Sequence, residues 1–326
     1  MEYRNLGNSG LKVSAVGLGC NNFGFRLNEQ ESVNIIHHAL DQGINYLDTA
    51  NWYSQRGLSE QYIGKATQER RSDVIIATKF GMDMGGINNQ GNSRNHILNA
   101  VEGSLKRLNT DYIDLYQIHR PDPATPIEET LMALDMLVRS GKVRYIGCSN
   151  FAAWQLADAR WIAQVKNLVP LITIQSEYNL LNRTLEKEIV PCCLAHQVGV
   201  IPWGPLAGGL LSGKYERAAA APSGSRVGMM ALYQGNFNQA NFDKLDALKV
   251  FAQERNRKLS DIAIAWLLAH PHVSSVIAGA TRTEQITDNI AGVNYKITQE
   301  EMTILNQITA DKTGEIAFGD KAQPKK

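Results

Sequence analysis

Residues 74–79 read Val-Ile-Ile-Ala-Thr-Lys, a short apolar run that ends in a basic side chain. Residues 44–48, before it, read Ile-Asn-Tyr-Leu-Asp, and residues 113–119, after it, read Ile-Asp-Leu-Tyr-Gln-Ile-His. Short runs rich in β-branched and aromatic residues indicate buried β-strands. Each of the three ends in an ionisable side chain, so we expect the ends of these strands to form part of a functional site.

Segments of this kind recur along the chain, and amphipathic helical patterns separate them. Eight barrel strands are predicted, at residues 15–18, 45–47, 74–78, 113–118, 145–148, 172–175, 200–203 and 276–277. Helices are predicted at residues 32–42, 97–108, 126–140 and 262–269. Eight strands alternating with helices indicate an α/β protein with the (β/α)8 TIM-barrel fold. Residues 8–13, Asn-Ser-Gly-Leu-Lys-Val, indicate half of an N-terminal β-hairpin.

Four residues are predicted to form one proton-delivery site: Asp48, Tyr53, Lys79 and His119. Active sites of such barrels lie at the C-terminal ends of the strands, which is where three of the four occur. A free tyrosine has a pKa near 10 and is a poor acid or base at neutral pH. A lysine ammonium beside it would favour the phenolate, and a carboxylate would hold that ammonium in place. The set suits protonation of a carbonyl oxygen while hydride reaches the carbon, which predicts a carbonyl reductase.

These residues lie in three motifs. They are Leu-Asp-Thr-Ala-Asn-Trp-Tyr at 47–53, Ala-Thr-Lys-Phe-Gly at 77–81 and Gln-Ile-His-Arg-Pro at 117–121. In these motifs, and from about residue 3 to residue 308, the chain resembles the aldo-keto reductase family. The resemblance implies that the four residues are a catalytic tetrad. Tyr53 would be the acid in reduction and the base in oxidation, tuned by Lys79 and Asp48. His119 would orient the carbonyl or assist the proton relay.

Polar side chains that can read a carboxamide follow the next strands. Ser149 and Asn150 end the fifth strand, and Gln175 ends the sixth. Side chains of these types offer the donors and acceptors that fix which ring face of a nicotinamide meets the substrate. The resemblance implies that they bind this amide and that Trp203, from strand seven, stacks on the ring.

A glycine-rich segment, residues 204–214, is expected to contact the diphosphate and ribose, because glycine lets a backbone approach phosphate closely. The predicted cofactor-binding residues here are Gly204, Pro205, Leu206, Gly208, Leu210 and Lys214. The segment is a near-miss P-loop, but Tyr215 stands where Ser or Thr would bind magnesium. Residues 17–22 likewise begin like a dinucleotide fingerprint, but Asn22 replaces its third glycine. We therefore reject both a nucleoside triphosphatase and a Rossmann fold.

Residues 279–285 and Asn289 bear on the choice between NADP and NAD. A loop that opens a helix after strand eight would favour an anion through free N–H groups and the helix dipole. Arg282 suits bidentate contact with the 2′-phosphate of NADP, so we expect NADP in preference to NAD. By resemblance, the cofactor-binding residues of this region are Gly279, Thr281, Arg282, Gln285 and Asn289.

Composition restricts the class of protein. The 326-residue chain has a net charge of +1, which gives no electrostatic reason to expect nucleic acid or an anionic membrane as partner. No apolar run approaches the length of a transmembrane helix. The four cysteines include no Cys-x-x-Cys pair, which fits a reducing cytoplasm and argues against a zinc site. We predict a cytoplasmic, metal-free enzyme with a small-molecule carbonyl substrate, and the sequence gives no oligomeric state.

Two further segments carry predictions. Residues 218–241 are rich in Ala, Gly, Ser and Asn, and a long irregular stretch inside a compact domain is commonly a lid. We expect this loop after strand seven to cover the cofactor. Residues 1–312 are interpreted as a single barrel domain, and residues 313–326 as a polar, mobile tail.

Substrate and function leave alternatives open. The apolar set Phe23, Phe25, Trp52, Met82 and Met84 suits aliphatic or aromatic aldehydes, whereas Arg26, Arg94 and Arg120 would suit an anionic substrate. The substrate is expected to be a small or medium-sized aldehyde, ketone or sugar.

Two other functions are open. Residues 203–215 also resemble the potassium-channel β subunits, which would make the chain an NADP-binding regulatory protein with slow turnover. An aldolase or isomerase using Lys79 as a Schiff-base amine is a third reading, although a carboxylate such as Asp48 lowers the nucleophilicity of a lysine.

Overall fold

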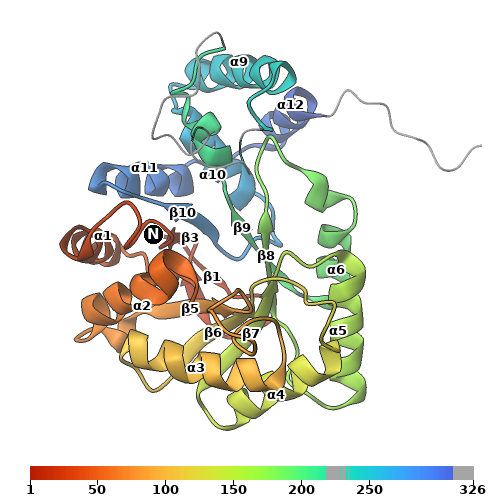
Figure 1. Cartoon of the computed structure of the whole chain (residues 1–326). Coiled ribbons are helices and arrows are strands. Elements are labelled where there is room, and N and C mark those ends of the chain that lie inside the picture. The colour runs from red at the N-terminus through yellow and green to blue at the C-terminus, as the bar shows by residue number, and fades with distance from the viewer. Residues whose placement is uncertain (218–227, 229–232, 234, 311–326) are drawn as a thin grey trace, which may run out of the picture.

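The centre of the protein is a closed barrel of eight parallel strands (Figure 1). The computed structural model describes residues 1–217, 228, 233 and 235–310. The barrel strands are β3 (Val16–Gly19), β4 (Tyr46–Asp48), β5 (Ile75–Phe80), β6 (Ile113–Ile118), β7 (Val143–Ser149), β8 (Thr173–Glu177), β9 (Gly199–Trp203) and β10 (Val276–Gly279). They follow one another around the barrel in chain order, and β10 closes it against β3. The predicted (β/α)8 fold is confirmed, and each predicted strand overlaps an observed one.

Helices surround the barrel (Figure 1). They are α1 (Glu29–Asp41), α2 (Tyr53–Thr67), α3 (Arg94–Leu108), α4 (Ile127–Arg139), α5 (Ala153–Val165), α6 (Ile189–His196), α9 (Gln239–Glu254), α10 (Leu259–Leu268), α11 (Thr283–Asn294) and α12 (Gln299–Thr309). Short 3₁₀ segments are η1 (Arg71–Asp73), η2 (Thr184–Glu186) and η3 (Ala207–Ser212). Helices α1 and α3 begin before their predicted starts because Asn28 and Ser93 cap them with side-chain oxygens.

Successive side chains of β5 point alternately to the barrel interior and to the surrounding helices. Ala77 belongs to the apolar cluster inside the barrel, whereas Ile76 and Phe80 belong to the layer between strands and helices. Because successive side chains of a strand point to opposite faces, Lys79 shares the interior face with Ala77, and Thr78 faces the helices. The interior is therefore apolar in its lower layers and polar at the C-terminal ends of the strands.

The N-terminal hairpin closes the other end of the barrel. Strands β1 (Tyr3–Asn5) and β2 (Lys12–Ser14) pair antiparallel, as predicted. Leu6 and Val13 are fully buried and pack with interior residues such as Tyr46 and Leu115. Full burial of a side chain of this size contributes about 1.5–3 kcal/mol to the stability of the fold. The hairpin therefore stabilises the barrel by filling this end of its interior.

Helix α9 corrects one predicted boundary. The irregular stretch was predicted to reach residue 241, but α9 begins at Gln239 because the Asn238 side chain accepts a hydrogen bond from the backbone N–H of Asn241. Most of residues 218–238 lie outside the described residues, as do the predicted domain boundary at residue 312 and the tail at 313–326.

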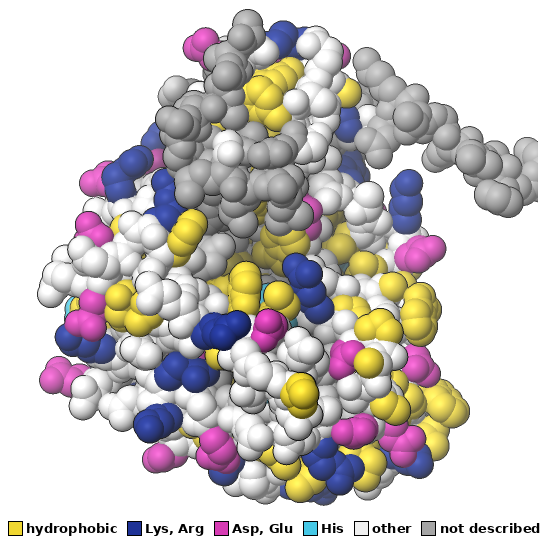
Figure 2. All heavy atoms as spheres, viewed as in Figure 1, with side chains coloured by type: hydrophobic (Ala, Val, Ile, Leu, Met, Phe, Trp, Pro, Cys, Tyr) yellow, Lys and Arg dark blue, Asp and Glu magenta, His cyan; other side chains and the backbone are white. Residues whose placement is uncertain are grey.

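The described surface carries charges of both signs, interspersed on the face shown in Figure 2. Within the described ranges, no helix combines the length and the apolarity needed to cross a bilayer.

We expect Gly7→Ala to destabilise the barrel and Gly10→Ala, in the same turn, to leave it nearly unchanged. Gly7 has a φ of +56°, and a Cβ there would lie 2.0 Å from the carbonyl oxygen of Ile172. Backbone would have to shift, at a cost of roughly 2–4 kcal/mol. At Gly10 the corresponding position has no heavy atom within 4 Å among the described residues other than its chain neighbours. Urea denaturation measures the two free energies of unfolding, and equal values would contradict the prediction.

Candidate active site

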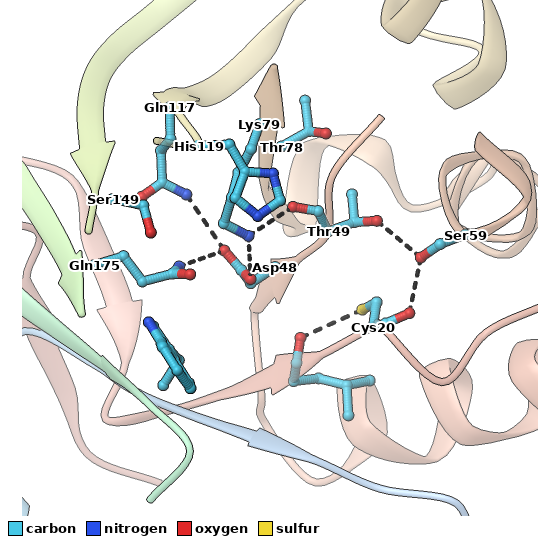
Figure 3. A network of polar contacts seen from close by, with 12 residues as sticks. Cys20, Asp48, Thr49, Ser59, Thr78, Lys79, Gln117, His119, Ser149 and Gln175 are labelled. Atoms are coloured by element: carbon cyan, nitrogen blue, oxygen red, sulfur yellow. Dashed lines mark hydrogen bonds and ion pairs between the residues drawn. The ribbon is translucent and has the colours of Figure 1, made fainter. Parts of the chain in front are cut away.

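Lys79 and Asp48 form a buried ion pair at the C-terminal ends of β5 and β4 (Figure 3). The distance from Lys79 Nζ to Asp48 Oδ1 is 2.6 Å, and the side chains are 1% and 4% exposed. The ammonium also donates to the carbonyl oxygen of Thr49 at 2.8 Å. Buried charges are tolerated when they are paired and hydrogen-bonded, and both conditions hold here.

The second oxygen of Asp48 accepts hydrogen bonds from two glutamine side chains (Figure 3). Gln175 Nε2 lies 2.7 Å from Oδ2 and Gln117 Nε2 lies 3.3 Å from it. Gln117 was missed by the sequence analysis, where it looked like part of an apolar strand. Its signal was the two-residue period of the strand. Leu115 and Gln117 share one face of β6, and because Leu115 lies in the barrel interior, so does Gln117.

Tyr53 and His119 complete the cluster that the sequence predicted. Their rings meet edge to face with centroids 5.8 Å apart, and Lys79 Nζ lies 5.2 Å from the centroid of the Tyr53 ring. The structure thus brings together all four residues of the predicted tetrad.

The backbone that follows Tyr53 departs from regular helix. Ser54, Gln55 and Arg56 have φ values of 53°, 52° and 60°, and Gly57 has a φ of 124°. Left-handed conformation in three successive residues with side chains is rare, since each costs about 1–2 kcal/mol. This turn was not predicted, because only Gly57 is a residue type that favours a left-handed conformation.

Burial dominates the electrostatics of Tyr53. It raises the pKa of the phenol above its ordinary value; the charge of Lys79 opposes this rise and that of Asp48 adds to it. Lys79 favours the phenolate, as predicted, but less strongly than burial favours the neutral phenol. Burial of the ammonium lowers the pKa of Lys79, yet the charges of Asp48 and Tyr53 raise it more, so the net pKa is raised. Lys79 is therefore a charged hydrogen-bond donor, which makes it a poor Schiff-base amine.

His119 is neutral over the physiological range. Burial, together with the positive charges of Lys79 and Arg120, lowers the pKa of its imidazole to about 3. Its Nδ1 is buried and has no hydrogen-bond partner among the described residues. A neutral imidazole with an uncommitted nitrogen can position a polar atom beside Tyr53 without adding charge.

The predicted carboxamide-reading residues also converge. Trp203 Nε1 donates to Asn150 Oδ1 at 3.3 Å, and Asn150 Nδ2 donates to Ser149 Oγ at 3.0 Å. Asn150 adopts a φ of 59° at the end of β7, which turns its amide toward Trp203. Gln175 uses its NH2 group on Asp48, so within the described chain its oxygen is left to accept and the Ser149 hydroxyl is left to donate. A carboxamide offers the complementary pair, and this donor set fits a nicotinamide.

The loop after β9 has the open backbone expected of a phosphate-binding segment. Ala207, Gly208 and Gly209 have φ values of 48°, 68° and 99°. Tyr233, one of the described residues of the predicted lid, is buried against this loop, and a Cβ on Gly208 would lie 2.7 Å from its ring. The exposed side chain of Lys214 lies beside Gly209. The remaining predicted contacts, Gly204, Pro205, Leu206 and Leu210, belong to the same turn.

The predicted 2′-phosphate region lies at the N-terminus of α11. Arg282 is the N-cap residue and its side chain is 71% exposed, with Nε 4.0 Å from an oxygen of Glu284. Gln285 Oε1 accepts from the backbone N–H groups of Thr281 and Arg282, so this oxygen shapes the loop itself. Asn289 is buried one turn later, and Gly279 is exposed at the end of β10.

Residues singled out for substrate contact are in different environments. Phe23 is fully buried in the core, so it is not a pocket-lining residue, whereas Phe25 and Trp52 are exposed. Arg94 begins α3, and its backbone N–H donates to Glu129. Among the described residues, no group of His, Cys, Asp and Glu has the arrangement of a metal site.

A family model and several known proteins match most of this chain. The model of the Aldo/keto reductase family matches residues 15–310. The chain is 39% identical to "Uncharacterized oxidoreductase YrpG" of Bacillus subtilis (strain 168), over 97% of this chain and 98% of that protein. It is 38% identical to "Probable voltage-gated potassium channel subunit beta" of Arabidopsis thaliana, over 99% of both chains. It is also 38% identical to "Versiconal hemiacetal acetate reductase" of Aspergillus parasiticus, over 94% of this chain and 96% of that protein.

We expect His119 to make the folded protein lose stability in mild acid. Its pKa is about 3 in the folded protein, against about 6.5 for an ordinary histidine. Between these values the unfolded chain binds a proton that the folded chain does not, so the free energy of unfolding falls as the pH falls from 6.5 toward 3. Between pH 7.5 and 5.5 the wild type should lose roughly 1 kcal/mol more than His119→Gln. Urea denaturation at the two pH values measures this, and equal losses would count against the assignment.

Proposed function

This chain belongs to the aldo/keto reductase family and is an oxidoreductase, and we propose that it reduces an aldehyde or ketone to an alcohol with NADPH. The observation that carries the proposal is the cluster of Tyr53, Lys79, Asp48 and His119 at the C-terminal ends of adjacent strands. Its chemistry matches the transfer of one proton to a carbonyl oxygen. NADPH, when bound, supplies the hydride.

Tyr53 is the proton donor in this proposal. Because burial raises the pKa of its phenol, the hydroxyl carries its proton at neutral pH. When the proton leaves, the nearby ammonium of Lys79 stabilises the phenolate, and Asp48 keeps that ammonium charged and in place. The stabilisation acts on charge that develops during the reaction, which is where it lowers the barrier.

His119 orients the substrate carbonyl. The ring lies edge to face with Tyr53, and the imidazole is neutral, so its N–H can hydrogen-bond the carbonyl oxygen that Tyr53 protonates. Because the imidazole is neutral at neutral pH, Lys79 is the cation of this cluster that stabilises the phenolate.

The cofactor is held by three groups of residues in this proposal. Ser149, Asn150, Gln175 and Trp203 orient the nicotinamide, and the turn from Gly204 to Lys214 contacts the diphosphate. Arg282 and the N-terminus of α11 hold the 2′-phosphate. The substrate is a small to medium-sized aldehyde, ketone or sugar. The enzyme works in the cytoplasm.

A second candidate function is NADP-dependent regulation of another protein. The observation that favours it is the 38% identity with the channel-subunit relative, as high as the identity with a named reductase. NADPH that stays tightly bound while aldehydes are turned over negligibly would favour this function. Loss of NADPH absorbance with a panel of aldehydes separates the two candidates.

We expect Tyr53→Phe to lower the rate of aldehyde reduction by roughly 100- to 10,000-fold, because it removes only the proton donor. The dissociation constant for NADPH should stay within about twofold of the wild type. NADPH absorbance with 4-nitrobenzaldehyde measures the rate, and quenching of protein fluorescence measures binding. A variant with the wild-type rate would eliminate Tyr53 as the acid.

We expect Arg282→Ala to raise the Michaelis constant for NADPH by roughly tenfold, because a charged hydrogen bond to the 2′-phosphate is lost. The constant for NADH, which lacks that phosphate, should change less than twofold. Arg70→Ala is the matched control, because it removes an exposed arginine that pairs with Asp41 away from the site. Equal effects on the two cofactors would remove Arg282 from the phosphate site.

A further inference from the structure

A buried carboxylate lies three residues beyond the left-handed turn that follows Tyr53. Glu60, on α2, is fully buried and accepts two hydrogen bonds. Thr78 Oγ1 donates to Glu60 Oε1 at 2.6 Å, and Arg107 Nε donates to Oε2 at 2.7 Å. Thr78 precedes Lys79 in β5, and Arg107 lies on α3, so one side chain joins three elements.

Arg107 also touches the turn itself. A Cβ on Gly57 would lie 2.4 Å from Arg107 Cδ and 2.5 Å from Nε, so the arginine side chain lies directly against the Gly57 backbone. Gly57 has a φ of 124°, which a residue with a side chain rarely adopts. The same arginine therefore packs on the end of the left-handed turn and pairs with Glu60, three residues further on.

The neighbouring residue ties the same helix to the proton-delivery cluster (Figure 3). The hydroxyl groups of Ser59 and Thr49 are 2.8 Å apart, and Ser59 Oγ donates to the carbonyl oxygen of Cys20 at 2.8 Å. The carbonyl oxygen of Thr49 in turn accepts from Lys79. Ser59 and Glu60 thus fix the start of regular helix on both sides, and the turn at residues 54–57 spans the gap back to Tyr53.

We propose that Glu60 and Arg107 are positioning residues that hold the left-handed turn and thereby place the Tyr53 hydroxyl beside Lys79. This inference rests on the proposed role of Tyr53 as proton donor. Left-handed residues with side chains relax unless their surroundings hold them. Arg107 packs on the end of this turn, and Glu60 holds Arg107 in place. Neither residue touches the reacting atoms, so their effect on the rate acts through Tyr53.

The test compares two buried ion pairs of similar burial. Arg107→Met removes the ion pair with Glu60 and leaves a side chain of similar volume, whereas Arg107→Lys keeps the positive charge. Arg71→Met is the matched control, because Arg71 pairs with Asp114 at 2.7 Å and their side chains are 15% and 9% exposed, against 20% and 0% for Arg107 and Glu60. Asp114 accepts from the backbone of Ile76, toward the opposite end of β5 from Lys79.

Two quantities are measured in each variant. One is the single-turnover rate of 4-nitrobenzaldehyde reduction by the NADPH complex, together with the dissociation constant for NADPH. The other is amide hydrogen exchange of a peptide spanning residues 53–60, which needs no turnover. If Arg107→Met does not fold, Glu60→Gln/Arg107→Met takes its place, because it leaves no buried charge unpaired.

Arg107→Met should lower the single-turnover rate at least tenfold with the NADPH dissociation constant within twofold, and should speed exchange in residues 53–60. Arg107→Lys should recover most of the rate, and Arg71→Met should stay within twofold of the wild type. A wild-type rate or unchanged exchange in Arg107→Met would overturn the proposal, as would an equal loss in Arg71→Met. A wild type that reduces no aldehyde would instead refute the proposed function. The exchange measurement would still test whether Glu60 and Arg107 hold the turn at residues 54–57.

Discussion

The buried ion pair between Asp48 and Lys79 is the constraint on which the site depends. An isolated charge in a protein interior is costly, so each charge here needs several partners. Lys79 finds them in Asp48 and the Thr49 carbonyl, and Asp48 finds them in Gln117 and Gln175. These partners come from β4, β5, β6 and β8, and only a closed barrel brings the ends of four such strands around one carboxylate.

The same pair explains the behaviour of Tyr53. Burial makes the phenol a weak acid, and the ammonium beside it compensates in part. The phenol therefore holds its proton at neutral pH, and the positive charge that would stabilise a phenolate is already beside it.

The sequence predicted what depends on local patterns. All eight barrel strands follow from short apolar runs. Asp48, Lys79 and His119 follow from the polar ends of three of these runs, and Tyr53 follows from the motif that resembles a known family. Gln117 was not predicted as a site residue, because its strand also contains apolar residues that face the helices. Only the residues at every second position face the interior, and Gln117 is one of them. The turn after Tyr53 could not be predicted from the sequence. Ser54, Gln55 and Arg56 are not residue types that favour the left-handed dihedrals they adopt, so tertiary contacts have to hold them. The net direction of the Tyr53 pKa was also missed, because burial is a tertiary property.

One end of the barrel is filled by apolar side chains that stabilise the fold, and the other end carries the candidate active site. At one end the hairpin fills the interior with apolar side chains such as Leu6 and Val13. At the other end lie features that cost free energy, namely the buried Asp48–Lys79 pair, the left-handed turn after Tyr53 and polar atoms without partners among the described residues. Both amide atoms of Asn51, between Asp48 and Tyr53, are of this last kind, as is His119 Nδ1. Unpaired buried polar atoms cost about 1–3 kcal/mol each, and a marginally stable fold tolerates few of them. The atoms of Asn51 and His119 lie close to Tyr53 in the chain or in space, so a polar group that enters the site can pair with them.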